Sequence, residues 1–399
     1  MKDQRVLSGM RPTGKLHLGH YQCVLKNWVE LQNEYDSYYF VADWHAFTTH
    51  YSDKIDLESY IIDMVIDWLA AGINPSTSTV FVQSKVPEHA ELHLLLSMTT
   101  PVSWLERVPS YKDQQEKLKT KDLATYGFLG YPVLQSSDIL MYKAGLVPVG
   151  EDQAAHVELT REIARRFNYI YGRETDFEEK AEKAVSKMGK KQAKLYRNLR
   201  KTYQETGDDE ALVKAKALLV EQKNITHGDR ERLLGYVEGF GKIILVEPEA
   251  LLTKTSKMLG LDGQKMSKSY NNVISLRDSA SEIEQKVNKM ATDPARVRLT
   301  DPGNPNKCPV WSLHEIYGPQ DQLDWVVDGC KNAKIGCIEC KKPVIDSIVA
   351  ELMPMQERIK KYKSEPNLIQ EIIFDGSERA RSVAKETMKD VRDAMGLTY

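Results

Sequence analysis

Short apolar runs alternate with segments of helical period from residue 1 to about residue 172. Clustered β-branched and aromatic residues predict strands at 5–8, 38–43 and 79–83. Residues 57–69 repeat apolar positions with the period of a helix, which we expect to end near Gly72. This alternation favours an α/β fold with a parallel, doubly wound sheet, which binds ligands at the carboxyl ends of its strands. His20, His45 and Gln83 follow or end predicted strands and are therefore candidate site residues.

The pattern changes at residues 173–240, where turn-forming residues are few and Lys, Glu and Ala dominate. Eight basic residues and no acidic residue lie between Lys183 and Lys201. We interpret 173–240 as a helical insert. A charge run usually marks a solvated face, so we favour that interpretation over a contact with RNA.

Beyond the insert, residues 243–246 predict one more strand. Helical patterns then follow at the end of the chain, at 281–290, 323–333, 343–362 and 367–395. The predicted organisation is an α/β domain formed by 1–172 and 241–279, the insert at 173–240, and an all-α domain at 280–399.

The length, composition and charge of the chain limit the class of protein to which it can belong. The 399 residues suffice for two or three domains, and 41% hydrophobic with 28% charged residues is typical of a soluble globular protein. The net charge of −2 provides no strong field for nucleic acid, so any RNA contact needs a local basic patch, and we expect no DNA partner. No apolar run is long enough for a membrane span, and no signal-peptide region follows Met1, so we expect a cytoplasmic protein with reduced or metal-bound cysteines.

Two short strings carry the candidate chemistry: Thr13–His20, which reads TGKLHLGH, and Lys265–Ser269, which reads KMSKS. A turn that opens a helix presents free N–H groups, and Gly19 allows a purine to lie against the backbone. Lysines on a mobile loop close over pyrophosphate, where negative charge develops. Each string alone also fits surface histidines or a basic loop, but their combination favours a site for a nucleoside triphosphate.

The two strings resemble the two signatures of the class I aminoacyl-tRNA synthetases. The segments 41–46, 131–139 and 147–166 are in addition similar to those of bacterial tryptophanyl-tRNA synthetases. The resemblance implies a homodimer with a Rossmann-like catalytic domain at 1–172 and 241–279 and an anticodon-binding domain at 280–399. It also implies activation of L-tryptophan by ATP with Mg²⁺ and transfer to tRNA(Trp).

The resemblance assigns roles to individual residues. It implies that Asp138 accepts the indole N–H hydrogen bond, since a buried acceptor rejects analogues that cannot donate one. The other residues implied to bind tryptophan are Leu7, His45, Tyr131, Gln135, Ile139, Val147, Val149 and Gln153. The residues implied to bind ATP are Arg11, Pro12, Thr13, Gly19, His20, Gly150, Glu151, Asp152, Met258, Lys265, Met266, Ser267, Lys268 and Ser269. The catalytic residues are expected to be His17, His20, Lys265 and Lys268.

Some positions depart from the family's common pattern, or allow a structural interpretation. Arg11, Leu7 and Gln135 stand where Gln, an aromatic residue and Met are frequent. From the residues alone, Asp138 fits a helix N-cap, because Ser136-Ser137-Asp138 precedes an apolar run. His45 fits a hydrogen-bonded core histidine equally well.

Four cysteines form a pattern of their own in the last third of the chain, with two residues between the last pair: Cys308, Cys330, Cys337 and Cys340. Four thiols with this ending fit a tetrathiolate site for zinc or an iron–sulfur cluster, and reduced structural thiols are the alternative. A subset of tryptophanyl-tRNA synthetases carries a 4Fe–4S cluster on similarly spaced cysteines. The resemblance therefore favours 4Fe–4S over zinc, with a structural role near the surface that reads the anticodon.

Three other functions are compatible with part of this sequence pattern. A tyrosyl-tRNA synthetase shares the fold and both signatures but needs a partner for a phenol hydroxyl. A nucleotidyltransferase also uses the first signature, but the second signature and the helical C-terminal region fit it poorly. A catalytically inactive, synthetase-like RNA-binding protein is the alternative that is not an enzyme.

Overall fold

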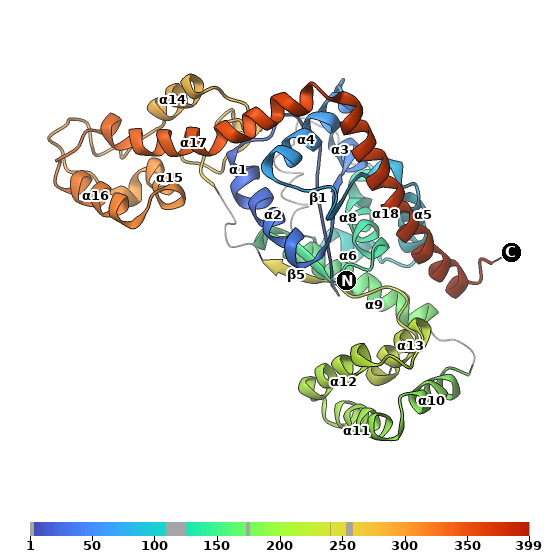
Figure 1. The fold of residues 1–399 in the computed structure, drawn as a ribbon. Coiled ribbons are helices and arrows are strands. Elements are labelled where there is room, and N and C mark those ends of the chain that lie inside the picture. Colours follow the sequence, from blue (N-terminus) through green and yellow to red (C-terminus); the bar gives the residue numbers. More distant parts are fainter. Residues whose placement is uncertain (1–3, 109–124, 173–175, 240, 253–257, 399) are drawn as a thin grey trace.

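The computed structural model describes residues 4–108, 125–172, 176–239, 241–252 and 258–398. At its centre, five parallel strands form a sheet in the order β3-β2-β1-β4-β5 (Figure 1). The strands are β1 (Arg5–Met10), β2 (Asp36–Val41), β3 (Ser78–Val82), β4 (Leu146–Val149) and β5 (Glu249–Leu252). The parallel sheet with helices around it confirms the predicted α/β fold class.

The strand predicted at 243–246 is wrong, and β5 lies a few residues later, at Glu249–Leu252. Residues 243–246 do not form a strand because the Asn168 side chain makes the backbone hydrogen bonds that a neighbouring strand would make. Asn168 accepts hydrogen bonds at Oδ1 from the backbone N–H groups of Ile244 and Leu245, at 2.9 and 3.0 Å, and donates to the Leu245 carbonyl at 2.7 Å. The apolar run is therefore buried without joining the sheet.

Helices connect the strands and cover the sheet. Up to β4 they are α1 (Leu18–His20), α2 (Lys26–Glu34), α3 (Asp43–His50), α4 (Leu57–Ala71), α5 (Glu88–Ser97), α6 (Val102–Glu106) and α8 (Tyr126–Met141). The π-helical turn η1 (Tyr21–Leu25) joins α1 to α2, and the short 3₁₀ turns are η2 (Gln83–Lys85), η3 (Glu151–Gln153), η4 (Lys268–Tyr270) and η5 (Pro305–Lys307). Helix α4 begins at the N-cap Asp56 and ends at Gly72, whose φ of 117° suits glycine, as the sequence predicts.

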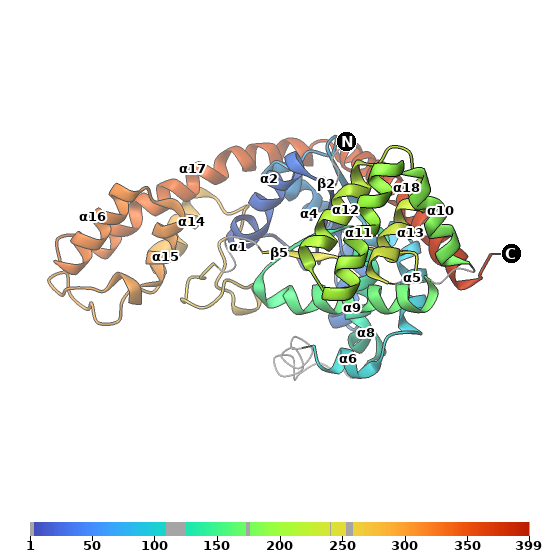
Figure 2. The same ribbon diagram turned by 90° about the horizontal axis from the view of Figure 1, so that it is seen from below.

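The insert region leaves the sheet after α9 (Ala154–Tyr171) and returns before β5. Its helices are α10 (Phe177–Lys187), α11 (Lys190–Thr206), α12 (Asp209–Glu221) and α13 (His227–Glu238). They enclose an apolar core of their own, which includes Tyr196, Leu219 and Leu233, and Figure 2 shows them as a bundle beside α9. Acidic partners within the insert neutralise part of its basic run, since Arg197 pairs with Glu182 at 2.8 Å.

Some of the C-terminal helices form a separate lobe, and the last one packs against the sheet. They are α14 (Ala280–Lys289), α15 (Pro309–Tyr317), α16 (Gln320–Lys331), α17 (Cys337–Lys363) and α18 (Pro366–Met395). Figure 1 shows α14, α15 and α16 in a lobe away from the sheet, with the long α17 leading back toward it. Helix α18 then packs on β3 so closely that a Cβ on Gly376 would stand 1.8 Å from the Val80 carbonyl oxygen.

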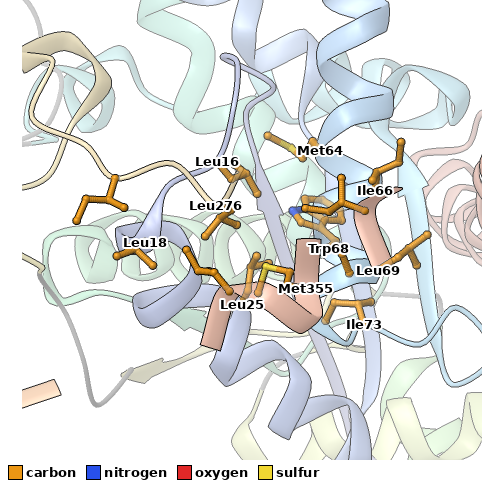
Figure 3. Close-up of a cluster of buried hydrophobic side chains, with 14 of the residues drawn as sticks. Leu16, Leu18, Leu25, Met64, Ile66, Trp68, Leu69, Ile73, Leu276 and Met355 are labelled. Carbon is orange, nitrogen blue, oxygen red and sulfur yellow. The ribbon is translucent and has the colours of Figure 1, made fainter. Parts of the chain in front are cut away.

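One apolar core joins the first signature, the second signature and the C-terminal lobe. It combines Leu16 and Leu18 with residues of α4, with Leu276 and with Met355 of α17 (Figure 3). Met258 and Met266 belong to the same cluster. Segments far apart in the sequence are therefore held at one side of the sheet, which fixes how the two signatures meet. No helix in the described part of the chain is long and apolar enough to cross a membrane.

Candidate active site

The first signature lies in the turn between β1 and η1. Because β1 ends at Met10, residues 11–20 emerge at the carboxyl end of the central strand. The His17 and His20 rings stack at a tilt with their centroids 3.8 Å apart, and the His17 backbone N–H donates to His20 Nδ1 at 3.3 Å. A Cβ on Gly19 would stand 3.0 Å from the His17 ring, so any larger residue would force that ring to shift.

The second signature is docked against the first. Lys268 donates from Nζ to the carbonyl oxygens of Thr13 and Gly14, at 3.2 and 2.8 Å. A single β-bridge pairs His17 with Ser275, and the Leu18 N–H donates to the Ile274 carbonyl at 2.9 Å. The fold therefore brings together the two strings whose combination predicts a phosphate-binding site.

The loop of the second signature is anchored on both sides. The Met266 N–H donates to the Met258 carbonyl at 2.9 Å, and both side chains are buried. Asn272 accepts from the Ser267 N–H at 2.7 Å, and its Nδ2 donates to Asp262 at 2.7 Å. Lys265 lies on the exposed side of this loop.

Burial controls the charges of this region. It lowers the pKa of His17 to about 4, and the nearby Lys268 adds to the shift. It lowers the pKa of His20 well below the usual value, with further contributions from His17 and Lys268. It lowers the pKa of Lys268 to about 8, although the Asp67 carboxylate opposes that shift. At neutral pH His17 and His20 are thus neutral imidazoles, whereas Lys268 is mostly an ammonium group, so neutral donors and a cation lie together where a triphosphate would bind.

Asp138 is the centre of a second cluster, inside α8 and almost wholly buried. Its Oδ2 lies 2.8 Å from His45 Nε2, and its Oδ1 accepts from Gln83 Nε2 at 2.8 Å and lies 2.6 Å from His89 Nδ1. The N-cap interpretation is wrong, because the N-cap of α8 is Thr125. Burial alone would raise the pKa of Asp138, but the hydrogen bonds and electrostatic attraction of His45 and His89 outweigh it and hold the pKa below the usual value.

The remaining residues expected around tryptophan are of two kinds: apolar residues in or against a buried cluster, which form the wall of the proposed site, and polar residues at its border. Leu7, Ile139 and Val147 belong to the same buried apolar cluster, and Val149 packs against it. Tyr131 is buried beside His156, with ring centroids 5.6 Å apart. His45 is buried on α3, whereas Gln135 of α8 and Gln153 of η3 are half-buried.

Three of the expected ATP residues, Gly150, Glu151 and Asp152, follow β4, the neighbour of β1 in the sheet. Gly150 caps the turn η3, and its carbonyl accepts from the Gln153 N–H at 2.9 Å. Glu151 and Arg11 are exposed, Thr13 is half-buried and Pro12 is buried. The side chains of Asp152 and Ser269, which the sequence also predicts to face ATP, lie outside the described part of the structure.

Sequence reasoning missed residues behind the site. His89 and Tyr142 stand behind Asp138, and a lone histidine on a helix gives no signal of such a role. Arg277 pairs with Asp63 at 2.7 Å and with the buried Asp67 at 2.9 Å, which ties the chain after the second signature to α4. An aspartate inside the apolar run of α4 was the available signal for this pair.

The four cysteines of the C-terminal lobe lie close enough to influence one another. All are free and half-buried. Burial raises the pKa of Cys340 to about 12, and the thiols of Cys308, Cys330 and Cys337 contribute to the shift. In the part of the chain that the structure describes, no three His, Cys, Asp or Glu side chains are arranged to hold a metal ion.

Comparisons with known proteins agree with this geometry. The family model for class I tRNA synthetases (W and Y) matches residues 1–199 and 226–353. A tryptophan–tRNA ligase from Ralstonia nicotianae is 62% identical over 399 residues and 100% of both chains. One from Thermotoga maritima is 45% identical over 397 residues, which covers 99% of this chain and 100% of the relative. The crystal structure of tryptophanyl-tRNA synthetase from Campylobacter jejuni complexed with ADP and tryptophan has a TM-score of 0.73 at 26% identity, and the match covers 98% of this chain and 100% of that one.

The fold and the two docked signatures are those of a class I aminoacyl-tRNA synthetase. Two relatives that match over their full length narrow the class to one amino acid. The chain belongs to the tryptophan–tRNA ligases, which join L-tryptophan to tRNA(Trp) with ATP.

Proposed function

We propose that the pocket around Asp138 binds the side chain of tryptophan and that the two docked signatures bind ATP. The proposal is carried by the buried carboxylate of Asp138, which accepts from Gln83 and lies within hydrogen-bond distance of His45 and His89, contacts that hold its pKa below the usual value. A carboxylate in an apolar wall is a strong acceptor for one N–H group, and the indole ring offers one such group. Leu7, Ile139 and Val147 supply apolar contact for the ring.

Polar residues at the border of the pocket would hold the reacting end of tryptophan. Tyr131 and Gln153 are suited to the amino and carboxylate groups, because each carries a polar group at the border of the wall. His45, Gln135 and Val149 complete the proposed pocket. Fixing the carboxylate next to ATP supplies much of the rate acceleration, since the two reactants then react as one molecule.

The two signatures would hold ATP from both ends. Gly19 would leave room for the purine, and Gly150, Glu151, Asp152 and the backbone near Met258 would face ATP and its ribose. Arg11, Pro12 and Thr13 would bind ATP beside the first signature. The loop over the phosphates would be formed by Lys265, Met266, Ser267, Lys268 and Ser269. Mg²⁺ would enter as part of the Mg–ATP substrate.

The reaction then needs no nucleophile from the protein. A carboxylate oxygen of tryptophan attacks the α-phosphorus of ATP, and pyrophosphate leaves with the electron pair of the broken P–O bond. His17, His20, Lys265 and Lys268 stabilise the charge that develops on the phosphates, with Lys268 in direct contact. A hydroxyl of the terminal ribose of tRNA(Trp) next attacks the adenylate carbonyl, and AMP leaves.

The larger organisation also belongs to the proposal. Residues 1–172 and 241–279 would form the catalytic domain, 173–240 a helical insert, and 280–399 the anticodon-binding domain. A homodimer is supported by exposed apolar side chains on or directly after the helices α5, α6 and α8, among them Leu94, Met98, Val102 and Tyr126. A cytoplasmic location follows from the role in translation.

We further propose a 4Fe–4S cluster on Cys308, Cys330, Cys337 and Cys340, where it would stabilise the lobe near the anticodon. The electrostatic interaction among the thiols supports the donor set, because Cys308, Cys330 and Cys337 must lie near Cys340 to influence its pKa. All four would have to bind the cluster as thiolates. Protein purified without air should be brown, contain about four irons per chain and lose both properties in Cys337→Ser. One zinc without colour, or no metal, would contradict the cluster.

The function itself is tested by ATP–pyrophosphate exchange. Tryptophan should support exchange and tyrosine should not. Asp138→Asn should lower kcat/KM for tryptophan by about 10- to 100-fold, the value of a hydrogen bond to a charged acceptor, and leave KM for ATP nearly unchanged. Exchange in Asp138→Asn equal to that of the wild type would contradict the proposed tryptophan pocket.

A further inference from the structure

Two buried hydrogen bonds in series connect Asp138 to His89 and His89 to Tyr142. His89 of α5 places Nδ1 2.6 Å from Asp138 Oδ1, and its Nε2 lies 2.7 Å from the Tyr142 hydroxyl. Both His89 and Tyr142 are completely buried. His45, by contrast, contacts the other carboxylate oxygen, Oδ2. The two oxygens of Asp138 therefore have separate partners.

The two partners of His89 favour the tautomer of its ring that carries the proton on Nδ1. Burial raises the pKa of the Tyr142 phenol well above the usual value, and the nearby Asp138 charge adds to the shift, so the hydroxyl keeps its proton. Because an ionised Asp138 can only accept, the Nδ1–H of His89 is the donor in that bond, and the Tyr142 hydroxyl can then donate to Nε2. This arrangement leaves Asp138 as an acceptor only.

Packing allows little freedom to either side chain. The His89 ring lies 6.2 Å from Phe81 and 6.3 Å from Phe40, measured between ring centroids, and Tyr142 lies 5.2 Å from Phe81. Gln83 adds a second donor to the same Asp138 oxygen. Because the aromatic side chains hold His89 in place, the carboxylate cannot rotate without breaking both bonds on Oδ1.

We propose that His89, oriented by Tyr142, is a positioning residue that determines specificity for tryptophan by keeping Asp138 ionised and fixed as an acceptor for the indole N–H. The proposal rests on the role proposed above for Asp138. His89 does not touch the substrate in this account. Its effect must therefore appear only with substrates that donate a hydrogen bond to Asp138.

The test compares tryptophan with β-(3-benzothienyl)-L-alanine, in which sulfur replaces the indole N–H. The ratio of the two kcat/KM values in pyrophosphate exchange cancels the fraction of active enzyme, so a loss of folded protein does not change it. His89→Leu should lower this ratio by about 10-fold or more, because the ionised acceptor loses a donor. His89→Asn keeps a donor near the Nδ1 position and should restore the ratio to within about 3-fold of the wild type.

Tyr142→Phe removes a single oxygen and gives the same test if His89→Leu does not fold. It should lower the ratio by a few-fold, since His89 then loses the partner that fixes its proton. An unchanged ratio in both His89→Leu and Tyr142→Phe would overturn the inference.

Asp138→Asn distinguishes a failure of the proposed indole acceptor from a failure of the role of His89 alone. A lowered ratio in Asp138→Asn with unchanged ratios in the His89 and Tyr142 variants would refute the role of His89 alone. An unchanged ratio in Asp138→Asn would refute the proposed indole acceptor, and the role of His89 with it. A lowered ratio in all three variants, with recovery in His89→Asn, is the result we expect.

Discussion

The charge of Lys268 predicts how ATP use depends on pH. Burial lowers the pKa of this lysine to about 8, and Lys268 donates hydrogen bonds to the Thr13 and Gly14 carbonyls beside the proposed phosphate site. The ammonium form, present below that pKa, attracts the triphosphate, and the neutral amine does not. We therefore expect kcat/KM for ATP to fall as pH rises from 7 to 9.

The magnitude follows from the fraction of Lys268 that is protonated. With a pKa of about 8, roughly nine-tenths of the free enzyme carries the charge at pH 7 and roughly one-tenth at pH 9. Since kcat/KM reports groups of the free enzyme, the expected fall is about ten-fold. His17, with a pKa of about 4, and His20, whose pKa is also lowered, titrate below this range and do not obscure it.

The assay is pyrophosphate exchange with varied ATP and saturating tryptophan at each pH. Lys268→Arg is the matched control, because a guanidinium keeps its charge throughout this range while every other titration remains. Its profile should be flat between pH 7 and 9, whatever its absolute rate. A flat profile in the wild type, or the same ten-fold fall in Lys268→Arg, would refute the assignment of the pH dependence to Lys268.

Two further predictions concern stability. Arg277→Leu leaves the buried Asp67 without its cation, and because burial raises the pKa of Asp67 to about 6, the ionised form is destabilising above that pH. We expect Tm to fall by several degrees at pH 8 and by clearly less at pH 5, where Asp67 is protonated, and equal losses would contradict this reasoning. Gly376→Ala should lower Tm strongly, because its Cβ would meet the Val80 carbonyl, whereas Gly127→Ala, whose Cβ meets no atom within 4 Å, should leave Tm nearly unchanged. Similar Tm values for the two variants would refute the close packing of α18 on β3.

The parts of the site that depend on local sequence could be predicted. The strings at 13–20 and 265–269 each combine a turn with charged or glycine residues, and the combination of the two strings indicates phosphate chemistry. Their contact through Lys268 is confirmed by the described geometry. The order of strands and helices likewise predicted the parallel sheet, because periodicity alone distinguishes the elements.

The parts that depend on tertiary partners could not be predicted. The apolar run at 243–246 reads as a strand, and only the distant Asn168 explains why it is not one. His89 sits on a helix with no motif around it, so its bond to Asp138 appears only when α5 and α8 pack together. The amphipathic pattern of α18 predicts a helix but cannot tell which surface covers it, and only the structure shows that Gly376 lies against the Val80 carbonyl.

The central claim is that Asp138 receives the indole while the two signatures hold the nucleotide. A crystal structure with a non-hydrolysable analogue of tryptophanyl-adenylate tests this most directly. We expect the indole nitrogen within hydrogen-bond distance of an Asp138 oxygen, the adenine against Gly19 and Lys268 at the phosphate position. An indole ring bound away from Asp138, with that carboxylate still hydrogen-bonded only to His45, Gln83 and His89, would contradict the account.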